Sequence, residues 1–294
     1  MTSTELLQSL TNTNGVMFDI DGCLVISDGP AGQDGRILDG AAEAIEYMKS
    51  SGRKYCVYTN GTAQKPSDIA AHLRELGIDV PDELVLTPAV VAAEVIKDMY
   101  GDKPIMMFGG EGMLYDFVKR GVNLVDIDAA IKGSKPEVAA VVIGWDTDFG
   151  KPKIQVAAEA ILAGAALYCT SFSPAFASKD RLNVGVSGFI TAGLLFVTET
   201  TEFEVLGKPS QHSMNIISRI LDTPIPEILV IGDDLYLEAS MARKSGAVAG
   251  LVTTGTSSAA DAEKCAPELK PHLVVDSMLE FVAAFSDADA QFRK

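Results

Sequence analysis

Short, almost uninterrupted apolar runs alternate along this chain with longer stretches whose apolar residues have helical spacing. A strand that is covered on both faces carries apolar side chains at nearly every position, as parallel strands between helices do. The alternation therefore predicts an α/β fold with a doubly wound, Rossmann-like parallel sheet and right-handed crossovers. The expected strands are residues 15–18, 55–58, 105–108, 139–143, 166–169, 228–231, 248–252 and 272–275.

Proline and glycine mark the ends of the expected helices. Pro66, Pro88 and Pro209 each open a helical stretch, since proline is tolerated in the first turn. Gly52 and Gly77 close two helices, because glycine readily takes the left-handed conformation of a helix end. The expected helices are residues 39–52, 66–77, 88–100 and 209–221, and residues 286–294 are expected to form a frayed end.

Composition narrows the class of protein. The chain has 294 residues, which is enough for two domains. Its net charge of −16 disfavours binding to nucleic acid and to anionic membranes. Because it has neither a long apolar run nor a secretory signal, we expect a soluble cytoplasmic protein. The four cysteines, none in a CxxC pair, are expected to be reduced thiols.

Three of the expected strands end in polar clusters. Asp19 and Asp21 follow the first strand, Thr59, Asn60 and Gly61 follow residues 55–58, and Asp233 and Asp234 follow residues 228–231. Ligands of open parallel sheets bind outside the carboxyl ends of the strands. If the three strands are neighbours, these polar groups converge on one crevice.

The residue types in these clusters suit phosphoryl transfer. Closely spaced carboxylates repel one another without a cation, and their oxygens are the ligands that Mg²⁺ prefers. Lys208, directly before an expected helix, can stabilise an oxyanion, as can the Thr59 hydroxyl and the amides of Asn60 and Gly61. One aspartate can act as the nucleophile while a second moves protons.

The segments DIDGCLV, YTNGT, GKPS and GDDLYLE, in this order, resemble the four motifs of the haloacid dehalogenase-like (HAD) phosphatases. Their spacing resembles subfamily IIA, the NagD-like and p-nitrophenyl-phosphatase-like branch with an α/β cap inserted between the second and third motifs. The resemblance implies a Mg²⁺-dependent phosphatase that hydrolyses a small phosphomonoester, such as a sugar phosphate or nucleotide, through an aspartyl-phosphate.

The resemblance also implies a role for each matching residue. Asp19 would be the nucleophile and Asp21 the general acid and base, while Thr59, Asn60 and Gly61 would bind phosphate and Lys208 would stabilise its charge. Mg²⁺ would be held by Asp19, Asp21 through its backbone carbonyl, and Asp233. Glu238 stands where the family usually has a second aspartate, and Asp234 could share its role.

The family pattern implies a core of residues 1–84 and 184–294 and an inserted cap of residues 85–183. A TNPD-like stretch follows the last cap strand in many relatives, but this chain has TSFSPAF at residues 170–176, which leaves the substrate open. Candidates for substrate contact are Trp145, Asp146, Ser171 and Ser173. Relatives often dimerise through the cap, and the sequence leaves both a monomer and such a homodimer open.

Simpler interpretations exist for each motif taken alone. An Asp-x-Asp-Gly segment or a Thr-Asn-Gly segment can be a turn, Asp233 can cap a helix, and Lys208 can be a surface lysine. A second hypothesis for the whole chain is a phosphometabolite-binding or regulatory module with little turnover. A third is a related enzyme that cleaves carbon–halogen or carbon–phosphorus bonds. Asp21 argues against a dehalogenase, which has no leaving alkoxide to protonate, and no lysine stands at a cap position recognisable as a Schiff-base former.

Overall fold

The structure is a computed structural model, and it describes residues 3–26, 35–176 and 183–293. The chain divides into two compact units. Unit 1 consists of Met1–Thr59, Pro66–Leu86 and Pro209–Lys294, and unit 2 consists of Asn60–Lys65 and Thr87–Lys208. Each unit is built around its own parallel sheet.

Unit 1 contains a six-stranded parallel sheet. Its middle strand β1 pairs with β12 on one side, where Phe18 lies opposite Ile231, and with β4 on the other, where Asp19 lies opposite Tyr58. The three strands that were expected to end in polar clusters are therefore neighbours. From edge to edge the strands are β14 (Leu273–Val275), β13 (Val248–Val252), β12 (Ile228–Gly232), β1 (Gly15–Asp19), β4 (Lys54–Tyr58) and β5 (Val85–Leu86).

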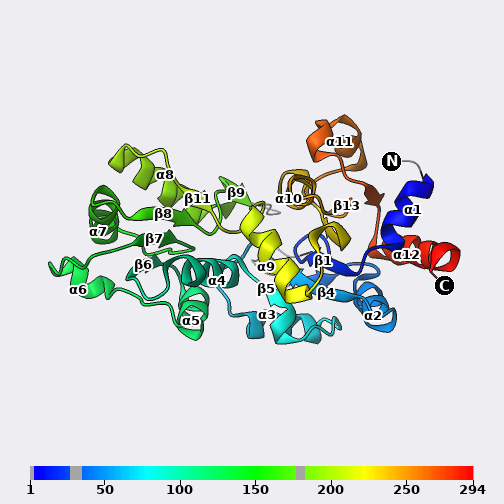
Figure 1. Ribbon diagram of the computed structural model, residues 1–294, viewed down its shortest axis with the longest axis horizontal. Coiled ribbons are helices and arrows are strands. Elements are labelled where there is room, and N and C mark those ends of the chain that lie inside the picture. The colour runs from blue at the N-terminus through cyan, green and yellow to red at the C-terminus, as the bar shows by residue number, and fades with distance from the viewer. Residues whose placement is uncertain (1–2, 27–34, 177–182, 294) are drawn as a thin grey trace. The chain divides into compact units, whose positions relative to one another are not determined.

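Helices cover both faces of this sheet (Figure 1). On one face, Phe18 of β1 packs edge-on against Phe281, with ring centroids 5.4 Å apart. On the other face, the Tyr58 hydroxyl lies 2.8 Å from that of Ser213. The first face carries α1 (Ser3–Thr11), α2 (Ala41–Ser50), α3 (Pro66–Glu75) and α12 (Met278–Phe292), and the second carries α9 (Gln211–Leu221) and α10 (Ser240–Ser245).

Short elements complete unit 1. A hairpin joins β2 (Val25–Ile26) to β3 (Arg36–Ile37) after β1, and a π-helical turn, Leu235–Ala239, follows β12. The remaining elements are α11 (Ala259–Lys264) and the 3₁₀ turns Asp82–Leu84, Ile225–Glu227 and Pro267–Leu269.

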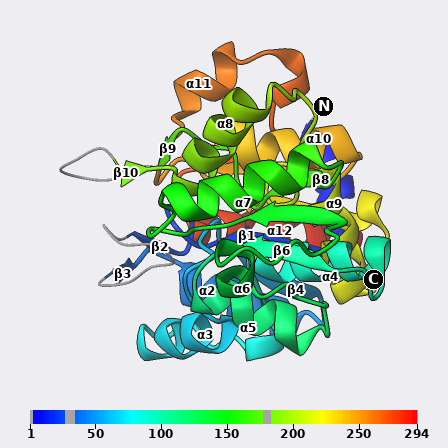
Figure 2. The same ribbon diagram turned by 90° about the vertical axis from the view of Figure 1, so that its left-hand side faces the viewer.

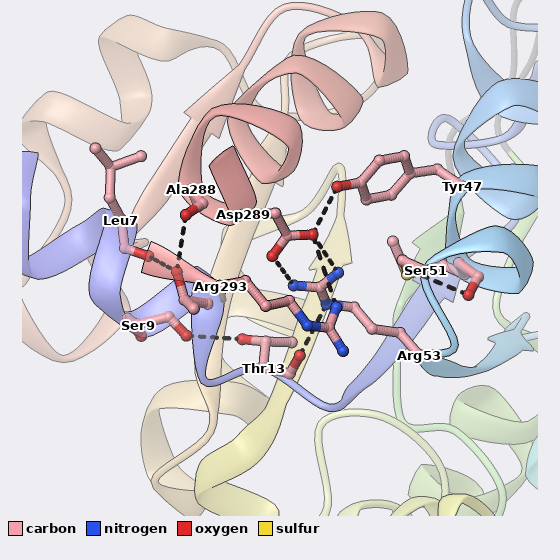
Figure 3. A network of polar contacts seen from close by, with 11 residues as sticks. Leu7, Ser9, Thr13, Tyr47, Ser51, Arg53, Ala288, Asp289 and Arg293 are labelled. Atoms are coloured by element: carbon pink, nitrogen blue, oxygen red, sulfur yellow. Dashed lines mark hydrogen bonds and ion pairs between the residues drawn. The ribbon is translucent and has the colours of Figure 1, made fainter. Parts of the chain in front are cut away.

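A buried ion pair ties the C-terminal helix to the rest of unit 1 (Figure 3). The guanidinium of Arg53 donates two hydrogen bonds to the Asp289 carboxylate, at 2.7 and 2.6 Å, and one to the carbonyl of Thr13 at 2.9 Å. The Tyr47 hydroxyl donates to the same carboxylate at 2.8 Å, and the guanidinium lies 4.9 Å from the ring centroid of Phe285. The Arg53 hydrogen bonds lower the pKa of Asp289.

Unit 2 contains a second parallel sheet, with α7 and α8 on one face and α4 and α5 on the other (Figure 2). Its strands, in order, are β11 (Glu204–Val205), β8 (Ala166–Cys169), β7 (Ala140–Ile143) and β6 (Ile105–Phe108). Its helices are α4 (Pro88–Tyr100), α5 (Glu111–Lys119), α6 (Ile127–Ile131), α7 (Lys151–Leu162) and α8 (Val186–Thr198), with a hairpin of β9 (Ala175–Phe176) and β10 (Asn183–Val184).

Asp116 on α5 is buried, and burial raises its pKa to about 7. Its Oδ2 atom has no hydrogen-bond partner among the described residues. The carboxyl group of Asp116 therefore keeps its proton in the folded chain at pH values where the unfolded chain has lost it. The contribution of Asp116 to the free energy of unfolding falls as pH rises from about 4 to about 7.

Asp116→Asn is expected to remove this pH dependence and to raise the melting temperature above pH 7 by a few degrees, because an amide is buried at lower cost than a carboxylate. Thermal unfolding measured between pH 4 and pH 8 checks this, with Asp102→Asn at an exposed carboxylate as the control. Equal pH profiles for Asp116→Asn and wild type would contradict it.

The predicted α/β fold class is confirmed, and each expected strand is present within one residue of its predicted ends. The two-residue strands β5 and β11 were not expected. The predicted frayed C-terminus is wrong for the described residues, because α12 continues to Phe292 and Asp289 holds it in place.

The boundary between the units lies at Lys208 rather than near residue 184. Ile190 and Leu194 of α8 pack into the same apolar cluster as Leu167 of β8, and Glu204 of β11 pairs with Tyr168, so both elements belong to unit 2. Residues 60–65 also belong to unit 2, whereas the sequence placed them in the core.

All four cysteines lie in the described residues and form no disulfide, as predicted. Of the helices in the described ranges, none combines the length and apolar character that crossing a bilayer requires.

Candidate active site

Asp19 is the last residue of β1 and is only 4% exposed. The chain then turns sharply, because the amides of Leu24 and Val25 both donate to the carbonyl of Ile20. Gly22 allows the turn, since its φ of +84° is a left-handed conformation that L side chains rarely adopt. The turn places Asp21 just beyond the carboxyl end of the central strand.

Thr59 follows β4, the strand next to β1, and is fully buried. Its hydroxyl donates a hydrogen bond of 3.2 Å to Oδ2 of Asp21, and its amide donates to the carbonyl of Leu86. The structure therefore brings two of the predicted site residues, Asp21 and Thr59, into direct contact.

Asp233 follows β12, the strand on the other side of β1, and is 7% exposed. A Cβ atom placed on Gly22 would lie 2.5 Å from Oδ2 of Asp233. Since any side chain at residue 22 would displace this carboxylate, the turn after β1 and the end of β12 lie against each other. Residue 255 must also be glycine, because a Cβ atom on Gly255 would lie 2.1 Å from the same oxygen.

Asp234 and Glu238 have local structural roles in the π-helical turn. Asp234 caps the turn by accepting a hydrogen bond of 2.7 Å from the amide of Tyr236. Glu238 is buried, and its carboxylate accepts from the amide of Asp234 at 3.3 Å. Its longer side chain lies over Gly232, where an added Cβ atom would be 2.3 Å from Cγ of Glu238. The proposed share of either residue in metal binding stays a prediction.

The remaining predicted phosphate-binding residues belong to unit 2. Asn60 and Gly61 begin the segment 60–65, and the buried Oδ1 of Asn60 has no hydrogen-bond partner among the described residues. Lys208 follows β11 and is 2% exposed, so it is not the solvated surface lysine of the simpler interpretation. Its predicted proximity to Asp19 stays a prediction.

The four candidates for substrate contact lie after two adjacent strands of unit 2. Trp145 and Asp146 follow β7, and Ser171 and Ser173 follow β8. The carboxylate of Asp146 is already paired with Lys153, whose Nζ lies 2.8 and 3.1 Å from its two oxygens. The hydroxyl of Ser171 lies 3.5 Å from that of Ser173. Their contact with a substrate stays a prediction.

One segment at this edge of unit 1 was missed by the sequence analysis. Residues 253–257, which follow β13, contact both Gly22 and Asp233. These residues make their contacts through a hydroxyl and backbone amides rather than through charged side chains. The only signal in the sequence was the dense run of Thr, Gly and Ser.

The groups in unit 1 fit a hard divalent cation. Gly22 and Gly255 allow the backbone of two segments to lie directly against the carboxylate of Asp233, and the predicted donors are carboxylate and carbonyl oxygens. No group of three His, Cys, Asp or Glu side chains able to bind a metal is found among the described residues. The predicted set does not need three, because one of its donors is the backbone carbonyl of Asp21.

Two family models match the chain. A model of haloacid dehalogenase-like hydrolases matches residues 16–123, and a second, HAD-hydrolase-like model matches residues 205–281. The first match contains Asp19, Asp21 and Thr59, and the second contains Lys208 and Asp233. All the motifs that carried the resemblance in sequence therefore lie within matched regions.

Curated relatives match most of the chain. An acid sugar phosphatase of Staphylococcus haemolyticus is 27% identical over 76% of this chain and 79% of its own length. Human chronophin is 24% identical over 95% of both chains. A rat haloacid dehalogenase-like hydrolase domain-containing protein is 29% identical over 89% of this chain and 92% of its own.

Solved structures share the fold over nearly the full length. A hypothetical protein of Pyrococcus horikoshii is 29% identical, with a TM-score of 0.82 over 92% of this chain and 98% of its own. A 4-nitrophenylphosphatase of Thermotoga maritima is 24% identical, with a TM-score of 0.82 over 94% of this chain and 99% of its own. The sequence matches, the shared fold and the positions of the motifs agree: the chain belongs to the haloacid dehalogenase-like hydrolases.

Proposed function

We propose that the chain is a Mg²⁺-dependent phosphatase that hydrolyses a small phosphate monoester through a phosphorylated Asp19. The observation that carries the proposal is the grouping at the carboxyl end of β1, where Asp19 is buried, Thr59 holds Asp21 and Gly22 lies against Asp233. The names of the relatives, an acid sugar phosphatase and a 4-nitrophenylphosphatase among them, support a phosphate ester as the substrate.

In the first proposed step, a carboxylate oxygen of Asp19 attacks phosphorus while the bond from phosphorus to the ester oxygen breaks. The leaving alkoxide takes a proton from the carboxyl group of Asp21. The hydrogen bond from Thr59 fixes the orientation of Asp21, so the proton is delivered from a defined position. When Asp21 is protonated, its carboxyl group can instead donate to the Thr59 oxygen, which leaves the single hydroxyl proton of Thr59 for the phosphoryl group of a bound substrate.

In the second step, Asp21 takes a proton from a water molecule as the water oxygen attacks phosphorus. The bond to Asp19 breaks, which regenerates its carboxylate and releases inorganic phosphate. Lys208 and the amides of Asn60 and Gly61 offset the charge of the phosphoryl oxygens. A Mg²⁺ ion held by Asp19, Asp233 and the Asp21 carbonyl would neutralise charge on the same oxygens.

Unit 2 is proposed to act as the cap that selects the substrate, with Trp145, Asp146, Ser171 and Ser173 as contacts. Its strands form a parallel sheet of their own, and polar residues follow two of them, Asp146 after β7 and Ser171 after β8. A cytoplasmic setting is part of the proposal, and both a monomer and a homodimer formed through unit 2 are compatible with it.

The test is phosphate release from an aryl phosphate, followed by a panel of sugar phosphates, nucleoside monophosphates and glycerol phosphate. Chelation with EDTA is expected to abolish release, and excess Mg²⁺ to restore it. Ca²⁺ is expected to restore little, because it prefers a larger and more flexible ligand shell. Full activity in EDTA would contradict the proposed metal dependence.

A result without turnover would also be informative. If a panel phosphate ester raises the melting temperature of the protein in Mg²⁺ but no phosphate is released, the non-catalytic binding module replaces the phosphatase.

A further inference from the structure

The loop after β13, residues 253–257, contacts both of the segments that the proposed metal ligands come from. Its sequence is Thr-Thr-Gly-Thr-Ser, and it lies in unit 1 with β1 and β12. None of its residues carries a charge, so the loop offers no carboxylate ligand of its own. Its hydrogen bonds instead reach the carboxylate of Asp233 and the backbone carbonyl of Gly22.

Two consecutive amides of the loop hold Asp233. The amide of Thr256 donates to Oδ2 of Asp233 at 2.6 Å, and the amide of Ser257 donates to its backbone carbonyl at 2.9 Å. The side chain and the backbone of one residue are thereby fixed by one short segment. Gly255 permits this approach, since a Cβ atom at that position would meet the carboxylate at 2.1 Å.

The same loop holds the turn after β1. The hydroxyl of Thr254 donates to the carbonyl of Gly22 at 2.5 Å. Gly22 directly follows Asp21, whose carbonyl is the proposed backbone ligand, so the two carbonyls belong to consecutive residues. The two carbonyls lie in adjacent peptide planes that meet at the Cα atom of Gly22, so the hydrogen bond from Thr254 anchors the plane next to the one that contains the Asp21 carbonyl.

We propose that Thr254 is a positioning residue for the divalent cation: its hydroxyl holds the Asp21–Gly22 turn at a fixed distance from Asp233, which the next residues of the same loop hold. The inference rests on the proposed function, since it takes Asp21 and Asp233 as metal ligands. Residues that orient metal ligands commonly change metal affinity about 10- to 100-fold when they are removed.

The chain offers a matched set of variants. Thr254→Val keeps the shape of the side chain and removes the hydroxyl, whereas Thr254→Ser keeps the hydroxyl. Thr253→Val is the control, because the hydroxyl of the neighbouring Thr253 donates at 2.8 Å to Asp276, an exposed contact that involves neither Gly22 nor Asp233.

Mg²⁺ affinity of the full chain is measured by titration calorimetry, and the Mg²⁺ concentration for half-maximal phosphate release is measured beside it. Thr254→Val is expected to weaken Mg²⁺ binding about tenfold, with Thr254→Ser and Thr253→Val within about twofold of wild type. Melting temperatures establish that each variant is folded. If Thr254→Val does not fold, Thr254→Ala takes its place with the same expectation.

Mg²⁺ affinity that is unchanged in the hydroxyl-free variant would overturn the inference, as would an equal loss in Thr254→Ser or Thr253→Val. A wild-type chain that binds no Mg²⁺ in the calorimeter would overturn it too. Failure of the proposed function looks different: no variant releases phosphate, while Mg²⁺ affinity still follows the presence of the hydroxyl at residue 254.

Discussion

Replacing Asp19 by Asn is expected to abolish phosphate release from an aryl phosphate, with kcat reduced by at least about a thousandfold. The amide nitrogen and oxygen of Asn are poor nucleophiles, so the phosphorylated intermediate cannot form. The substitution is nearly isosteric, and at a residue that is 4% exposed it removes a charge without leaving a cavity. The loss should therefore appear in kcat, with the fold retained.

The measurement is steady-state phosphate release in excess Mg²⁺, together with a melting curve and a search for a phosphoryl adduct after acid quenching. Wild type is expected to carry the adduct on Asp19, and the variant to carry none. Asp276→Asn, at the aspartate that directly follows β14, serves as the control and should keep its activity. An Asp19→Asn variant with wild-type kcat would rule out the covalent mechanism.

Asp289→Ala is expected to lower the free energy of unfolding of unit 1 by about 3–5 kcal/mol at pH 7. The side chain of Arg53 is fully buried, and two of its hydrogen bonds go to Asp289. Removal of the carboxylate leaves the buried guanidinium charge without its ion-pair partner and without two of its hydrogen bonds. The loss is therefore larger than that of a surface ion pair.

The effect has a defined pH dependence. The Arg53 hydrogen bonds lower the pKa of Asp289 in the folded chain below its ordinary value of 3.8. Its stabilising contribution is therefore complete above that value and is lost as pH falls below it through the folded-state pKa. The difference between wild type and Asp289→Ala should be constant from neutral pH to about 5 and should shrink below about 4.

Urea unfolding followed by circular dichroism, at several pH values, measures this difference. The matched control is Asp79→Ala, which removes an exposed pair in which Lys49 lies 2.6 Å from the carboxylate, and which should lower the free energy of unfolding far less. Equal losses for the buried and the exposed pair would show that Asp289 contributes no more than a surface charge.

The sequence was sufficient for features that depend on local pattern. The strands of both sheets were predictable because each is a continuous apolar run between helical stretches, and Asp19, Asp21, Thr59 and Asp233 because each follows such a run. The strands β5 and β11 were not predictable in the same way. A two-residue strand has no periodicity, and its pairing depends on the strand beside it.

What the sequence did not reveal depends on contacts between distant residues. Asp289 looked like part of a polar, frayed end, because its partner Arg53 lies 236 residues away. Thr254 and Thr256 act on Gly22 and Asp233 through a hydroxyl and an amide, and nearly every residue has an amide. The boundary at Lys208 followed from the packing of α8 on β8, which residue types alone do not specify.

The short segment Asn60–Lys65 limits how this protein could be recombined with a relative. The amide of Trp145 donates to Thr62 at 3.3 Å, and an added Cβ atom on Gly112 would lie 2.5 Å from the carbonyl oxygen of Gln64. A chimera that transplants Thr87–Lys208 alone would separate Trp145 from the Thr62 hydroxyl and Gly112 from the Gln64 backbone. A functional chimera therefore has to include Asn60–Lys65 together with Thr87–Lys208, although α3 and β5 of unit 1 lie between these two segments in the sequence.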